Sequence, residues 1–204
     1  MSKPSWLITN PITEGSGNGT IKNSANEHTG RVARVGIVTV TANGLETPKT
    51  YKVTQSPTPE FVVFKDGAEM AASKEGGVLK ILGTSNGTGF TFSWIGENYD
   101  VEIPSKYTAN GLETNNGEEI EGDPGANSQF DWEVSINIPE NETVEEITRT
   151  LKVTTEGGVS AQIAIKQTAG NPTLEIEPEE IVITREGTPA VDVHVTSNTT
   201  WTIS

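Results

Sequence analysis

Three aromatic residues of this sequence are of the type that binds sugars. Pyranose rings carry apolar C–H faces, which stack on exposed Trp and Tyr rings. Tyr107 follows Pro104 at the start of a long acidic segment, and Trp94 and Tyr99 flank a nearby turn. We therefore expect Tyr107 to be exposed and rank it first as a ligand-binding residue, with Trp94 and Tyr99 behind it.

Acidic side chains crowd the segment of residues 107–129 and are candidates for calcium binding. Ca²⁺ accepts six to eight oxygen ligands in a flexible shell. The spacing does not follow the alternating ligands of an EF-hand loop, so a solvated acidic loop is the alternative. The candidate metal ligands are Glu118, Glu119, Glu121 and Asp123.

No arrangement of residues predicts catalysis. A pair of glycosidase carboxylates needs a fixed separation of about 5 to 10 Å, and a mobile acidic loop is a poor frame for that. The two histidines are His28 and His194. His194 alternates with valines and shares the outward face of a predicted strand with Asp192, without a nucleophile elbow. The sequence therefore indicates a protein that is not an enzyme.

Composition excludes several classes of partner. The 204 residues carry a formal charge of −14, which repels nucleic acids and anionic lipid surfaces. No apolar run approaches the roughly 18 residues needed to cross a bilayer. The chain has no Cys, so neither disulfides nor thiolate metal sites contribute.

The chain contains an internal repeat whose matched positions are separated by a constant offset, since 163 minus 51 and 196 minus 84 both equal 112. We call this value the repeat offset. A shared offset at both ends of a unit is typical of tandem copies. The matched residues are Tyr51, Val53 and Gln55 with Ile163, Ile165 and Gln167, and Thr84, Ser85 and Asn86 with Thr196, Ser197 and Asn198.

Short alternating apolar and polar runs separated by Gly-containing turns predict an all-β fold of antiparallel sandwiches. The predicted strands are residues 36–41, 49–55, 78–82, 90–94, 131–138, 150–155, 161–167 and 191–195. Their phase places five aromatics on core faces: Phe90, Phe92, Trp94, Phe130 and Trp132. Trp6 shares a face with Ile8, and Trp201 with Ile203, which predicts buried structural roles for both.

Two short Pro-containing linkers, residues 56–60 and 169–173, divide the chain into one complete repeat and two partial ones. Short linkers hold neighbouring units close and predict a rod. Residues 107–129 lack periodicity and have no counterpart in the first unit, so we expect a loop inserted in the middle copy.

Several segments resemble the BACON (Bacteroidetes-associated carbohydrate-binding often N-terminal) domain: TSNTTWTIS, SWLITNP, EGSGNGTI, HTGRVARVGIVTVT and YKVTQSP. By this resemblance, residues 1–57 are the C-terminal part of one domain, residues 58–170 a complete BACON-like domain with the insertion 107–129, and residues 171–204 the N-terminal part of a further domain. The resemblance implies tandem immunoglobulin-like sandwiches in an exported protein at the bacterial surface, in the periplasm or secreted. Its signal segment would lie upstream.

The two partial units are expected to complete each other, in cis or in trans, because a half-sandwich exposes apolar faces and strand edges. The function predicted first is binding of polysaccharide or mucin-type glycans. A structural spacer, or a protein–protein assembly module without glycan affinity, is the alternative.

Overall fold

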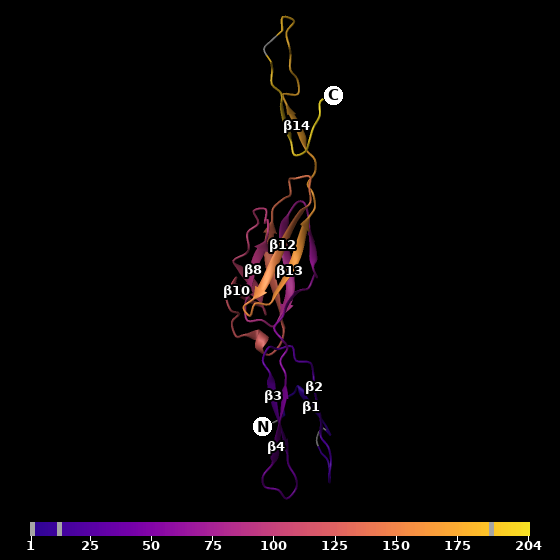
Figure 1. Ribbon diagram of the computed structural model, residues 1–204, viewed down its shortest axis with the longest axis vertical. Helices are drawn as coiled ribbons and strands as arrows, with labels where there is room; N and C mark the ends of the chain where they lie inside the picture. Colours follow the sequence, from indigo (N-terminus) through magenta and orange to yellow (C-terminus); the bar gives the residue numbers. More distant parts are fainter. Residues whose placement is uncertain (1–2, 12–13, 188–189) are drawn as a thin grey trace.

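The computed structural model describes residues 3–11, 14–187 and 190–204, and in these residues the fold is all-β. Three units follow one another along a single long axis (Figure 1). We call residues 3–57 the N-terminal unit, 58–170 the middle unit and 171–204 the C-terminal unit. In the described part of the chain, no helix is long and apolar enough to cross a membrane.

The middle unit is a sandwich of two sheets. One sheet has the order β10-β9-β11-β7-β5 and the other β6-β13-β12-β8. Its strands are β5 (Val62–Phe64), β6 (Glu69–Ala72), β7 (Gly77–Ser85), β8 (Phe90–Ile95), β9 (Lys106–Ala109), β10 (Leu112–Asn115), β11 (Phe130–Ile138), β12 (Ile147–Thr155) and β13 (Ser160–Gln167). Without β10 and β6, this order matches the ABED and CFG sheets of an immunoglobulin constant-type domain.

All strand pairs are antiparallel except one. Strand β5 pairs antiparallel with β7 in the first sheet, and the chain then crosses over so that β6 pairs parallel with β13 in the second. The first two strands of the middle unit, β5 and β6, thus each form the edge of one sheet.

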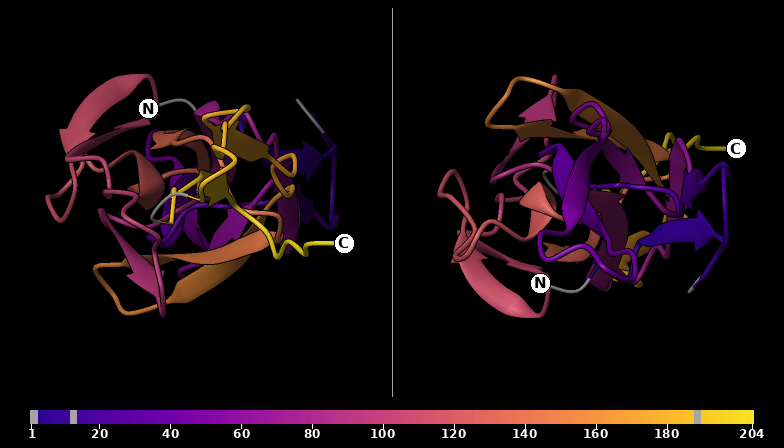
Figure 2. Two further views of the ribbon diagram at one scale, coloured as in Figure 1. Left: turned by 90° about the horizontal axis from the view of Figure 1, so that it is seen from above. Right: turned by 90° about the horizontal axis from the view of Figure 1, so that it is seen from below.

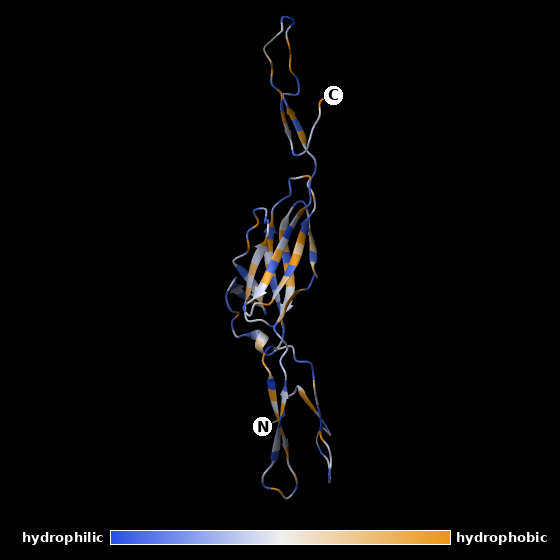
Figure 3. Ribbon diagram, in the orientation of Figure 1, coloured by the Kyte–Doolittle hydropathy of each residue, from blue (hydrophilic) through white to orange (hydrophobic). Residues whose placement is uncertain are grey.

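The core of the middle unit lies between the two sheets. Hydrophobic residues alternate with hydrophilic ones along its strands (Figure 3), as their period of two requires. Of the five predicted core aromatics, Phe90, Phe92, Phe130 and Trp132 are buried and Trp94 packs against the core while half-buried. Gly83 is needed beneath Trp132, because a Cβ there would lie 2.0 Å from the indole ring.

The N-terminal unit consists of two hairpins. Strand β1 (Leu7–Asn10) pairs with β2 (Lys22–Ala25), and β3 (Arg34–Val40) pairs with β4 (Lys49–Gln55). Leu7 is fully buried and Ile8 is exposed. The prediction that Trp6 and Ile8 face a core is therefore wrong: the residues of β1 that point inward are Leu7 and Thr9, and Trp6 stacks under the Arg34 guanidinium at 4.6 Å.

The C-terminal unit consists of one hairpin, β14 (Leu174–Glu177) with β15 (His194–Ser197), followed by the extended residues 200–204. His194 and Asp192 are both exposed, as predicted. Trp201 is also 49% exposed, so the buried role predicted for it is not realised within this chain.

The expected insertion contains regular secondary structure. Strands β9 and β10 form a hairpin that extends the first sheet and stands at one side of the molecule when viewed along its length (Figure 2), and a 3-10 helix, η1 (Pro124–Ala126), follows. The prediction of a loop over 107–129 is thus wrong for the residues of β9, β10 and η1. Asn110-Gly111, both with positive φ, supplies the tight hairpin turn.

Candidate functional site

The side chain of Asn86, at the end of β7, joins the N-terminal and middle units. It is fully buried. Its Oδ1 accepts a hydrogen bond from Phe61 N at 2.9 Å, and its Nδ2 lies 3.1 Å from Thr29 O of the N-terminal unit and 3.2 Å from Pro59 O of the linker. One amide thereby ties together two units and the segment between them.

Asn198 makes the same set of bonds one repeat later. Its Oδ1 accepts from Thr173 N at 2.8 Å, and its Nδ2 donates to Asn171 O at 2.8 Å and to Glu142 O of the middle unit at 2.7 Å. Positions 61 and 173, and 59 and 171, are separated by the same repeat offset as the two asparagines.

The serine before each asparagine also repeats its contact. Ser85 Oγ donates to Phe61 O at 2.5 Å, and Ser197 Oγ donates to Thr173 O at 2.7 Å. The linkers add one backbone bond each to the preceding unit: Thr58 N donates to Gly30 O, and Gly170 N to Thr143 O. We call each of these two arrangements a Ser-Asn joint.

The first Ser-Asn joint carries an additional contact from the segment that follows β10. Arg31 N and Val32 N each donate to a carbonyl of η1, Gly125 O and Ala126 O, at 2.9 Å. The Arg31 guanidinium pairs with Asp123 and donates through Nε to Asn86 O at 2.9 Å. We call this contact between η1 and residues 29–32 the brace.

Close backbone approach makes the brace dependent on glycine. A Cβ on Gly125 would lie 2.0 Å from Asn86 O, and a Cβ on Gly30 would lie 2.4 Å from the Asn127 carbonyl carbon. Both are distances that real Cβ atoms do not show. A side chain at Gly30 would therefore separate the two units, and one at Gly125 would displace η1 from the end of β7.

Tyr107 is not an exposed aromatic platform. It is 3% exposed, its hydroxyl donates to Glu118 O at 3.2 Å, and it accepts from Phe90 N at 3.1 Å. Burial raises the pKa of its phenol, and the hydrogen bond from Phe90 opposes that shift. The prediction of exposure failed because residues 106–109 form β9, whose alternate side chains point into the core.

The turn after β8 does present one exposed aromatic ring, that of Tyr99. It is 43% exposed, and the guanidinium of buried Arg149 lies 5.3 Å from its centroid. Arg149 is fixed by Asn98 O and Gln167 Oε1, and burial lowers its pKa while the charge interaction with Tyr99 raises it. Trp94 donates from Nε1 to Val101 O at 2.7 Å, so it holds this turn in place.

The four candidate metal ligands do not converge. Among the described residues, no group of three or more His, Asp or Glu side chains is placed to hold a metal ion. Asp123 instead pairs with Arg31 in the brace. A shallow polar hollow does lie beside Glu118, Glu119 and Glu156, where Gly89 bridges to Glu119.

The two histidines lie in different units and in different surroundings. His28 is buried beside the first Ser-Asn joint, where its Nε2 lies 2.7 Å from Val32 O. His194 is exposed on β15 in the C-terminal unit.

Sequence reasoning did not identify the joint residues as functional. Thr84–Asn86 and Thr196–Asn198 were recognised as matched segments, but their register alone did not reveal that the asparagine amides bridge units. An amide at the end of a predicted strand, repeated next to a short linker, is the pattern that points to them. Nothing in the sequence singled out Arg31 or Gly125.

Comparison with known proteins gives no family for this chain. No family model and no curated protein match it. Among solved structures it is similar to the extracellular cadherin domains 1–4 of protocadherin gamma B7 (14% identity, TM-score 0.36, covering 94% of this chain and 47% of that one). It is also similar to domains 4–9 of the surface layer protein SbsC (12% identity, TM-score 0.37, covering 96% of this chain and 36% of that one).

The chain therefore spans less than half the length of each of these structures. The immunoglobulin-like assignment rests on the strand order of the middle unit, and the resemblance to BACON domains stays a prediction.

Proposed function

We propose that this chain is a non-catalytic spacer segment of an exported surface protein, in which immunoglobulin-like units are held at fixed spacing and orientation. The observation that carries the proposal is the Ser-Asn joint, which recurs one repeat later with the corresponding linker partners and with a carbonyl of the preceding unit. A flexible tether between binding modules has no need of such bonds, whereas a rod does.

The physical basis is the cost of leaving buried polar groups without partners. Bending the first joint would separate the buried amide of Asn86 from Thr29 O, and it would also break the bonds of Arg31 N and Val32 N to η1, which lie nearer the surface. Each unsatisfied buried group costs about 1–3 kcal/mol. Because these groups share one interface, they must break together, which keeps the straight arrangement populated.

The test is small-angle scattering of the whole chain with Asn86→Ala and a matched control, Asn137→Ala, at an exposed position of β11. We expect Asn86→Ala to shorten the largest dimension and broaden the distance distribution, while Asn137→Ala leaves both unchanged. A wild-type chain that already samples bent shapes, or an Asn86→Ala chain that stays as extended, would contradict the proposal.

Glycan binding is the second candidate function, and the observation that favours it is the Tyr99 ring. It is exposed on a turn that Arg149 and Trp94 hold rigidly, so a sugar would meet a pre-positioned aromatic face. Tyr107 takes no part in this version of the site, because it is buried.

Titration calorimetry of the whole chain against polysaccharides and mucin-type glycans, with and without Ca²⁺, tests this second function. Saturable heat that Tyr99→Ala abolishes and Glu140→Ala, an exposed position outside this turn, retains would establish binding at the turn. Heat that requires Ca²⁺ and is lost in Glu119→Gln would point to the acidic segment instead. If no glycan of the panel gave heat of binding, the spacer function would be the one that remains.

A further inference from the structure

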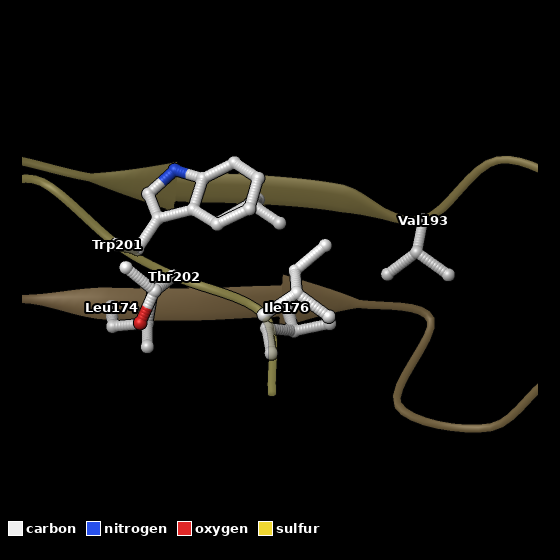
Figure 4. A pocket seen from close by; sticks show the side chains of 7 residues that line it. Leu174, Ile176, Val193, Trp201 and Thr202 are labelled. Carbon is white, nitrogen blue, oxygen red and sulfur yellow. The ribbon is translucent and has the colours of Figure 1, made fainter.

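The C-terminal unit exposes a continuous apolar face. Its hairpin and the extended residues after it line an open hollow of about 280 Å³. The Trp201 ring lies over the hairpin on this side (Figure 4). Ile176 is 48% exposed and Ile203 is 88% exposed. The residues that line this face, which we call the C-face, are Leu174, Ile176, Val193, Val195, Trp201 and Ile203.

The middle unit shows what covers such a face. Strands β14 and β15 pair Leu174 with Ser197 and Ile176 with Val195, and β5 and β7 pair Val62 with Ser85 and Phe64 with Gly83. Each of these positions is related to its counterpart by the repeat offset. Val62 and Phe64 are 4% and 8% exposed, because the opposite sheet and β11 pack over them, whereas Leu174 is 56% exposed.

The N-terminal unit holds strands that have no equivalent among the described residues of the C-terminal unit. Strands β3 and β4 pair Val38 with Tyr51, as β12 and β13 pair Leu151 with Ile163. The described residues of the N-terminal unit form no strands equivalent to β5, β7 and β8 of the middle unit, so no such strands lie next to β1, β2 and β3. Val40 is accordingly 41% exposed, whereas its counterpart Val153 is fully buried. We call this open side the N-face.

The two partial units carry opposite charge. Residues 1–57 contain six basic and three acidic residues, a formal charge of +3, and residues 171–204 contain one basic and six acidic residues, a charge of −5. Charge complementarity of this kind favours encounter between the two surfaces and disfavours pairing of like with like.

The two faces of one chain cannot meet, because the N-terminal and C-terminal units lie at opposite ends of the middle unit (Figure 1). We propose that the C-face of one copy of this chain receives the N-face of a second copy, so that the two complete one immunoglobulin-like sandwich. The middle units of the two copies then lie at opposite ends of the completed sandwich, and the contact repeats head to tail in an open chain. The spacer function does not require this association.

The first experiment measures the mass of the chain by light scattering during size-exclusion chromatography over a wide range of concentration. We expect wild-type mass to rise above the 21.8 kDa of one chain as concentration increases. Ile176→Asp on the C-face and Val40→Asp on the N-face are each expected to return the mass to one chain. Ile183→Asp, whose counterpart Ala71 is exposed in the middle unit, is the matched control and should associate like wild type.

An equimolar mixture of Ile176→Asp and Val40→Asp, each altered on one face only, distinguishes specific pairing from misfolding. Ile176→Asp retains a sound N-face and Val40→Asp retains a sound C-face, so the mixture should form a species of two chains that grows no further. Variants that had simply unfolded could not rescue each other in this way.

Wild-type chain that stays at the mass of one chain, or a mixture that forms no two-chain species, would overturn the proposal. Association that survives Ile176→Asp would do so too. Because the mass reports on association and scattering of Asn86→Ala reports on joint rigidity, either proposal can fail while the other stands.

Discussion

The two Ser-Asn joints use the same amide, but only the first is reinforced. Asn86 and Asn198 both bind their linker and the carbonyl of a preceding unit. Around Asn86 the brace adds η1 and Arg31, and the amide is fully buried. Around Asn198, the described residues add no comparable element, and its bonds are exposed. The repeat therefore supplies the basic joint, and the segment after β10 supplies its rigidity.

The largest difference in stability between the two joints is expected when the asparagine amide is removed from each joint in turn. We expect Asn86→Ala to lower the free energy of unfolding of the first joint by about 2–4 kcal/mol, because several partly buried groups lose a partner together. Asn198→Ala should cost only about 0.5–1 kcal/mol, because water replaces the exposed bonds. Native-state hydrogen exchange at the amides of Phe61 and Thr173 measures both effects. Equal losses at the two joints would show that burial does not distinguish them.

Displacing η1 from the end of β7, and with it from residues 29–32, tests the contribution of the brace separately. Gly125→Ala places a Cβ against Asn86 O, so we expect a loss of about 1–3 kcal/mol, as for other overpacked sites. Chemical denaturation of the whole chain measures the loss. Gly19→Ala, where a Cβ meets nothing within 4 Å, is the control and should change little. If Gly125→Ala were as mild as Gly19→Ala, the brace would not be a tight contact.

The buried hydroxyl of Tyr107 links the inserted hairpin to the core, and Tyr107→Phe should cost about 1–2 kcal/mol through the loss of its bonds with Phe90 N and Glu118 O. The pKa of Tyr107 is raised in the folded state. Its contribution to stability is therefore complete below the unfolded pKa of about 10 and is lost as pH rises through the folded pKa. Unfolding free energies measured from neutral to alkaline pH should fall less steeply in Tyr107→Phe, and parallel curves would refute the linkage.

The smallest effect is expected from the charge pair of the brace. Arg31→Ala removes the pair with Asp123 and the bond to Asn86 O, at a cost of about 0.5–1 kcal/mol for a partly exposed site. Added salt should weaken the wild type toward the variant, because it screens the pair. Arg31→Lys keeps the charge but loses the Nε bond, and denaturation at two salt concentrations distinguishes the two contributions.

Strand positions were predictable where apolar and polar residues alternate along the whole strand. All eight predicted runs correspond to observed strands, although the last is displaced to His194–Ser197. Strands β5, β6 and β14 are too short to show a period, and β9 and β10 lie in a segment whose many acidic and Gly residues hid its alternation. Short strands of this kind are selected by their neighbours in the sheet and not by their own sequence.

The candidate sites were less predictable, because exposure depends on which side of a strand faces the partner sheet. Tyr107 looked like the entrance to a loop but is the inward residue of β9, and Asp123 looked like a metal ligand but pairs with an arginine 92 positions earlier. Tyr99 was ranked behind Tyr107, yet it is the one of the three candidates that is exposed.

The sequence by itself determined the all-β class, the internal repeat with its constant offset and the aromatic core of the middle unit, because periodicity and self-similarity are local properties. Only the tertiary structure decided that Asn86 and Asn198 join units, that η1 reinforces one joint, and that the N-face and C-face stay open. These features depend on contacts between residues far apart in the chain, such as Asn86 with Thr29, and no spacing within one segment encodes them.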